Sequence, residues 1–226
     1  MPRRRHALDE SFFERIDSEP KAYWLGVLIG DGWVGRYSFT LGLADEEHVR
    51  AFRDTVAPEA PLRWQMSQKS PRPQWSVTVC SVRMIRDLAR HGFVPGKPNR
   101  WAWQGRLDLQ RHFWRGVVDA DGALSAGPQW CLTVSGHDPI LRAFAAFAHT
   151  FTHTQAVPSE CASRHSWQIR IGGRRVTRAI VELLYKGATV ELTRKAALAA
   201  AIIATPTRRY RPGEATSVSR GCSAAC

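Results

Sequence analysis

The sequence lacks any apolar run that approaches the length of a membrane-spanning helix, and it lacks an apolar core near its amino terminus. A membrane span needs about 20 mostly apolar residues, and a secretory leader needs an apolar stretch behind its basic residues. The opening segment MPRRRHALDE has the basic residues without that stretch. We therefore expect a cytoplasmic protein with no membrane partner.

Cysteine is scarce, and its spacing does not predict a disulfide framework. The chain has five Cys in 226 residues, and the first three lie far apart in the sequence. Cys80 and Cys131 adjoin alternating apolar runs, which predicts buried free thiols. Cys222 and Cys226 have no His nearby, so a zinc site is not expected.

Acidic residues and lysine are both in short supply. Asp and Glu together number 20 against 32 Lys and Arg, which leaves a formal net charge of +12. Only 5 of those 32 basic residues are Lys. Arg makes bidentate contacts with phosphates and with guanine, so this balance favours a nucleic acid as the partner. A GC-rich genome would also enrich Arg, and the composition favours a bacterial or phage origin.

The sequence does contain a repeated motif, WLGVLIGDG at 24–32 and WRGVVDADG at 114–122. Each copy has an apolar run, small residues four apart, and an acid followed by Gly. Residues four apart lie on one face of a helix, and small residues there let two helix backbones approach closely. We therefore expect the two motif helices to pack against each other through Gly26, Gly30, Gly116 and Ala120.

The segments after the two motifs match in order, with strand patterns, an amphipathic helix, a basic stretch with a further strand, and another helix. This order predicts an α+β fold, a tandem pseudo-two-fold repeat of an αββαββα unit with two antiparallel sheets. The predicted parts are an N-terminal extension at 1–17, a first repeat at 18–92, a linker at 93–107, a second repeat at 108–204, and a basic tail, expected to be disordered, at 205–226. The expected strands cover 33–43, 61–69, 74–80, 124–135, 157–165 and 167–172. The expected helices after the motifs cover 44–56, 83–92, 137–151 and 174–187. The last of these lies towards the end of the second repeat.

The acids at the ends of the two motif helices carry the functional signal. If the helices pack about a pseudo-two-fold axis, Asp31 and Asp121 lie together at their carboxyl ends. Helix carboxyl ends carry partial negative charge, so two acids there disfavour stability but suit a divalent cation. Acids that hold Mg²⁺ beside a basic surface predict metal-assisted hydrolysis of a phosphodiester.

These features resemble the LAGLIDADG homing endonucleases. WRGVVDADG matches the nine-residue signature of that family well, and WLGVLIGDG differs at Ile29 and Gly30 but keeps the acid and the final Gly. The resemblance extends over about residues 18–200 and includes LYKGATVELTRK at 184–195. It implies a single-chain, pseudo-symmetric monomer with the motif helices between its halves. It also implies a saddle of two sheets that lies in the major groove of a long double-stranded DNA site.

The resemblance also implies the metal site. The acids at the eighth motif position, Asp31 and Asp121, would coordinate Mg²⁺, with Gly30 and Ala120 placed at the same site. The two strands would be cut across the minor groove, leaving short 3′ overhangs. Ca²⁺ is expected to replace Mg²⁺ without supporting cleavage.

Members of the family commonly carry a basic residue near each acid. By position in the repeats, Lys97 and Lys195 correspond to these residues, and each would polarise the attacking water or stabilise the developing charge. Asp119 has Ile29 at its matching place. We therefore expect Asp119 to serve packing or helix capping rather than metal binding.

The predicted strands offer a polar face for reading DNA. Their apolar residues, such as Phe39 and Val77, are expected to face the core. Arg and Gln on the opposite face can make bidentate contacts with guanine and adenine in the major groove. The candidate DNA-contacting residues are Arg36, Ser38, Thr40, Arg63, Gln65, Lys69, Arg72, Gln74, Thr78, Gln129, Thr133, Arg164, His165, Gln168 and Arg170.

Three functions fit these features. The first is a site-specific double-strand endonuclease. The second is a maturase that binds its host intron RNA, with or without nuclease activity, since some proteins that resemble this family have that role. The third is a non-catalytic DNA-binding regulator on the same fold, which the presence of both motif acids disfavours.

Overall fold

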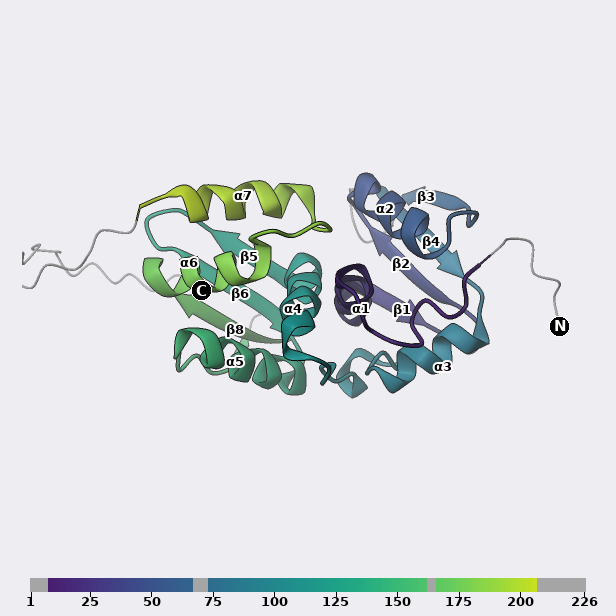
Figure 1. The fold of residues 1–226 in the computed structure, drawn as a ribbon, viewed down its shortest axis with the longest axis horizontal. Coiled ribbons are helices and arrows are strands. Elements are labelled where there is room, and N and C mark those ends of the chain that lie inside the picture. The colour runs from purple at the N-terminus through teal and green to yellow at the C-terminus, as the bar shows by residue number, and fades with distance from the viewer. Residues whose placement is uncertain (1–7, 67–72, 162–165, 207–226) are drawn as a thin grey trace, which may run out of the picture.

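The computed structural model of the chain describes residues 8–66, 73–161 and 166–206. Figure 1 shows two halves of similar architecture, each with one sheet and its helices, and helices α1 and α4 lie where the halves meet. The first half contains α1 (Glu19–Asp31), β1 (Gly32–Val34), β2 (Phe39–Leu43), α2 (Glu46–Val56), β3 (Leu62–Met66), β4 (Pro73–Val79) and α3 (Val82–Arg90). A short 3₁₀ helix, η1 (Lys97–Asn99), lies in the connection. The second half contains α4 (Leu107–Asp121), β5 (Gly122–Ser125), β6 (Cys131–Gly136), α5 (Asp138–Thr152), β7 (Ser159–Cys161), β8 (Ser166–Gly172), α6 (Arg174–Tyr185) and α7 (Thr193–Ala204).

The order of elements in the first half is the predicted αββαββα unit, and the second half repeats it and adds α7. The α7 sequence TRKAALAAAIIA is rich in Ala, which has the highest helix propensity of all residues. No helix in the described part of the chain is both long enough and apolar enough to cross a membrane. The predicted tail lies outside the described residues from position 207 onward.

The two antiparallel sheets have the same topology. Their strand orders are β1-β2-β4-β3 and β5-β6-β8-β7. Paired apolar residues of the two central strands are buried on the helix-covered face of each sheet. In the first sheet these residues are Phe39, Leu41, Val77 and Val79. At the matching places of the second sheet they are Leu132, Val134, Ile169 and Ile171.

Two expected strands are each interrupted by a turn. The stretch 33–43 forms β1 and β2, joined by a turn in which the Gly35 amide donates to the Ser38 carbonyl at 2.9 Å. The stretch 124–135 likewise forms β5 and β6. The chain reverses at each turn, so that the two short strands pair with each other rather than extending as one. Alternation alone did not reveal the reversal between β1 and β2, because the strand-like alternation of apolar residues continues through the turn.

Helix α5 follows the N-cap residue His137, and Asp138 lies in its first turn. The Asp138 carboxylate accepts a hydrogen bond from Arg142 at 2.7 Å. Cys80 is exposed rather than buried, because it follows the last residue of β4, whereas Cys131 is a buried free thiol as expected.

Helices α1 and α4 approach so closely that no side chain fits between them at two positions. A Cβ atom on Gly26 would overlap the carbonyl oxygen of Phe113, and a Cβ atom on Gly116 would overlap that of Tyr23. Each Gly therefore faces the backbone of the partner helix. This packing compensates for the roughly 1 kcal/mol that a Gly costs inside a helix.

We predict that Gly116→Ala lowers the free energy of unfolding by about 3 kcal/mol, because the new methyl group would meet backbone that cannot move aside cheaply. Urea denaturation followed by circular dichroism measures the change. Gly172→Ala is the control, since no atom lies within 4 Å of the Cβ that it adds. The control should stay within about 0.5 kcal/mol of the wild type. Equal stability of Gly116→Ala and the wild type would contradict this account of the helix contact.

Candidate active site

The two motif acids lie at the adjoining carboxyl ends of α1 and α4. Asp31 is the last residue of α1, and Asp121 is the last residue of α4. Gly30 lies against the junction, because a Cβ atom on it would overlap the Cβ of Ala120 and lie 3.1 Å from Oδ2 of Asp121. The four residues that the sequence assigns to a metal site therefore come from two neighbouring helix ends.

Burial and mutual repulsion oppose the ionisation of these acids. Burial, followed by the charge of Asp121, raises the pKa of Asp31 to about 6. Burial also raises the pKa of Asp121, although the charges of Lys97, Lys195 and Arg100 oppose that shift. The protein's own cations therefore do not fully compensate the two carboxylates. Such a site favours the binding of a divalent cation.

The donor set at this junction fits a cation that shares its shell with water and substrate. Among residues 8–66, 73–161 and 166–206, no group of three or more His, Cys, Asp or Glu side chains gathers into a metal-binding cluster. Mg²⁺ needs no such cluster, since one or two carboxylates usually hold it together with water and phosphate oxygens. Asp31 and Asp121 meet that requirement.

A buried arginine that the sequence reasoning missed holds the end of α1. At the end of α1 the Arg100 guanidinium donates to three carbonyl oxygens at 3.3, 2.6 and 2.7 Å, which belong to Leu28, Ile29 and Gly32, and its Nε also donates to the Val94 carbonyl at 3.3 Å. It also stacks on the Phe93 ring, with 4.6 Å between the guanidinium carbon and the ring centroid. Arg100 thus neutralises the carboxyl end of the helix that carries Asp31.

Lys195 has the corresponding place beside α4. Its Nζ donates to three carbonyl oxygens at 2.6, 2.8 and 2.6 Å, which belong to Val118, Asp119 and Gly122. These acceptors match, motif position by motif position, those of Arg100. The structural equivalent of Lys195 is therefore Arg100, and the expected equivalence of Lys97 and Lys195 is wrong. An ammonium group has three protons to donate, so the contacts assign Lys195 to holding the helix end, and a direct catalytic role stays a prediction.

Lys97 lies at the open side of the junction. It begins η1, its side chain is 45% exposed, and its Nζ is 3.8 Å from Oδ2 of Asp121. The charge of Lys97 lowers the pKa of both motif acids. Its exposed ammonium is thus the cation beside the acids that can also reach a bound phosphate or water. The catalytic role expected of Lys97 stays a prediction.

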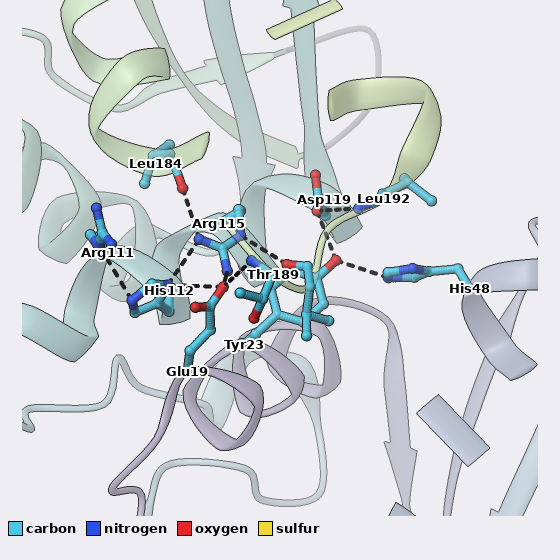
Figure 2. A network of polar contacts seen from close by, with 11 residues as sticks. Glu19, Tyr23, His48, Arg111, His112, Arg115, Asp119, Leu184, Thr189 and Leu192 are labelled. Atoms are coloured by element: carbon cyan, nitrogen blue, oxygen red, sulfur yellow. Dashed lines mark hydrogen bonds and ion pairs between the residues drawn. The ribbon is translucent and has the colours of Figure 1, made fainter. Parts of the chain in front are cut away.

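Asp119 belongs to a buried network that joins the two halves (Figure 2). Its carboxylate accepts hydrogen bonds from the Tyr23 hydroxyl at 2.7 Å and from the Tyr185 hydroxyl at 2.6 Å. The amide of Leu192, just before α7, donates to it at 2.9 Å. The Tyr23 hydroxyl is also 2.9 Å from Nε2 of His48 on α2. These internal bonds agree with the packing and capping role expected for Asp119.

A second part of this network was also missed from the sequence. Arg115, a buried residue of α4, donates to Oε1 of Glu19 at 2.6 Å and to the Leu184 carbonyl at 2.8 Å. Glu19 also accepts the Thr189 amide at 2.7 Å. The bonds fasten the start of α1 and the chain after α6 to α4. A charged residue within the apolar motif WRGVVDADG was the available signal for a buried partner.

The first sheet gathers candidate DNA-contacting residues on the face opposite its buried residues, here called the outer face. Thr40 pairs with Thr78, and their hydroxyl oxygens are 2.9 Å apart. Gln65 pairs with Gln74, and Arg63 lies two residues along the same strand, so these side chains also point outward. Arg36 and Ser38 lie in the turn before β2.

The second sheet presents a similar outer face with different residues. Thr133 pairs with Arg170, and Gln168 lies two residues away on β8, so all three share the face. Gln129 is exposed just before β6. The other candidates lie outside the described residues: Lys69, Arg72, Arg164 and His165.

Several solved structures have the same fold as this chain. The N-terminal LAGLIDADG domain of DUF199/WhiA covers 83% of this chain and 93% of its own, at 14% identity and a TM-score of 0.54. The LAGLIDADG homing endonuclease I-GzeII, in complex with its DNA target, matches 87% of this chain and 89% of its own, at 9% identity and a TM-score of 0.54. I-DmoI, in complex with DNA and Ca, matches 84% of this chain and 97% of its own, at 12% identity and a TM-score of 0.50. No protein-family model and no curated protein sequence matches the chain.

We predict that Asp31→Asn stabilises the metal-free protein at pH 7.5 but not at pH 4. The Asp31 carboxyl titrates near 3.8 in the unfolded chain and at about 6 in the folded protein. Its contribution to stability is therefore present below about pH 4 and is lost as the pH rises through 6. Asn carries no charge, so the free energy of unfolding of the variant should exceed that of the wild type by about 3 kcal/mol at pH 7.5. Denaturant titrations in EDTA measure this difference, and an equal offset at both pH values would contradict the raised pKa of Asp31.

Proposed function

We propose that this chain, which has the LAGLIDADG fold, is a site-specific homing endonuclease that makes a double-strand break in a long DNA target. The main support for the proposal is that Asp31 and Asp121 lie together where α1 and α4 end. Two acids with raised pKa values at one junction disfavour stability and suit a bound cation. One chain supplies both acids and both sheets, which supports action as a monomer.

The outer faces of the two sheets support duplex DNA as the substrate. Each presents Thr, Gln and Arg side chains at paired positions, and a two-stranded ribbon of this kind fits the major groove. The net charge of +12 supplies long-range attraction for a polyanion. Each sheet begins directly after a motif acid, so a duplex along the sheets would bring its backbone to the acids.

The groups around the helix junction divide the chemical work. The residues that would hold Mg²⁺ are Asp31, Asp121, Gly30 and Ala120. When bound, the cation would stabilise charge on the phosphate and lower the pKa of an attacking water. Arg100 and Lys195 fix the helix ends and hence the carboxylates, and Lys97 would meet the phosphate from the exposed side.

Two other functions remain alternatives to cleavage. Host intron RNA would meet the same basic faces, and a splicing assay with and without the protein tests for maturase activity. A regulator that binds DNA without cutting it would gain nothing from two repelling acids, so the raised pKa values of Asp31 and Asp121 disfavour that function.

We predict that Asp31→Asn and Asp121→Asn each abolish cutting while largely preserving DNA binding, because each removes one cation-binding carboxylate. A randomised duplex library incubated with the wild type and Mg²⁺ identifies the target, and gel assays measure cutting and binding. Ca²⁺ in place of Mg²⁺ should support binding only. Asp108→Asn is the matched control, because Asp108 is an exposed acid at the opposite end of α4 that pairs with Arg106 at 2.7 Å. If both motif variants still cut, the site assignment is wrong.

We also predict that Arg170→Ala weakens binding to the selected target by about 5- to 150-fold, the range expected for loss of one bidentate base contact. Selection with the variant should relax at one or two base pairs in the same half of the target. Arg142→Ala removes the same charge from α5, away from the outer face, and should bind as the wild type does. Equal affinities of the two variants would argue against the second sheet as the DNA-reading surface.

A further inference from the structure

Trp33 exposes an aromatic side chain on the outer face of the first sheet. It is the middle residue of β1, between two buried residues, and it is 61% exposed. Trp33 pairs with Thr40, and Thr40 pairs with Thr78, so the indole shares its face with their two hydroxyl groups. Within the described parts of the two sheets, no other outer-face position carries an aromatic side chain.

The backbone of Trp33 lies close to the helix junction. Trp33 follows Asp31 by two residues, which corresponds to roughly 7 Å along the chain. Its ring extends over Gly35, because a Cβ atom on Gly35 would come within 2.5 Å of Cη2 of Trp33. The missing side chain at Gly35 thus leaves room for the indole to lie along the sheet, on the side of Trp33 that faces away from Asp31.

The matching place in the second sheet has no such group. The row of paired outer-face residues nearest the first acid consists of Trp33, Thr40 and Thr78. The corresponding row beside the second acid consists of Ala123, Thr133 and Arg170. In the row nearest its acid, the first half therefore presents a large apolar side chain, whereas the second half presents a methyl group and a charge.

We propose that Trp33 packs its indole against the nucleotide that flanks the scissile phosphate on the Asp31 side, and that this contact makes the two strand cuts unequal. The inference rests on the endonuclease function proposed above. Covering an exposed indole is favourable because it removes apolar surface from water, and Trp is among the residues that contribute most at interfaces. Ala123 offers no equivalent contact, so the nucleotide at the other cut is held less firmly.

The test compares Trp33→Ala with the wild type on the selected duplex, labelled separately on each strand. Trp33→Ala should weaken binding by about 5- to 150-fold, the range of one aromatic contact with a base. It should slow one strand cut more than the other, so that nicked duplex accumulates. The dependence of affinity on salt should not change, because no charge is removed. Trp33→Phe should recover part of the affinity.

Trp64→Ala is the matched control. Trp64 is 55% exposed on the same sheet but pairs with Trp75 on the opposite face, so its removal should leave both binding and strand rates as in the wild type. If Trp33→Ala behaves like Trp64→Ala, the inference is overturned. A wild type that binds but does not cut contradicts the endonuclease function, and the binding comparison then still decides whether Trp33 contacts DNA. A wild type that binds no duplex overturns both.

Discussion

The close contact between α1 and α4 is the constraint on which the rest of the structure depends. Gly26 and Gly116 each face the backbone of the opposite helix, so the two helices end side by side. Each helix is followed immediately by the first strand of its sheet. One contact therefore sets both the separation of Asp31 and Asp121 and the placement of the two outer faces. A change that separates the helices would disturb the acids and the sheets together.

Asp31 and Asp121 add negative charge at the carboxyl ends of two helices, which already carry partial negative charge. Arg100 and Lys195 oppose it by donating to matched carbonyl oxygens of the two motifs, yet the pKa of Asp31 is still raised to about 6. The packing of the motif helices and the buried network around Asp119 hold the junction together despite that repulsion. A local conflict of this kind, maintained by the surrounding structure, is typical of a functional site.

Duplication explains how much of this could be predicted from the sequence. One acid followed by Gly predicts only a turn, but two copies with matched small residues and matched following elements predicted the helix pair, the topology and the meeting of the acids. The roles of Arg100 and Arg115 could not be predicted, because their acceptors are distant in sequence, such as Ile29 and Glu19. The turn at Gly35–Ser38 was missed because strand-like alternation continues through it.

The proposed function requires that Asp31 and Asp121 together bind a divalent cation at the helix junction. A crystal structure of the wild type with its selected duplex and Mn²⁺, which shares the oxygen ligands of Mg²⁺, tests it through the anomalous scattering of the metal. We expect anomalous peaks within coordination distance of both carboxylates and of a DNA phosphate. A complex with ordered DNA and Mn²⁺ bound only elsewhere would contradict it.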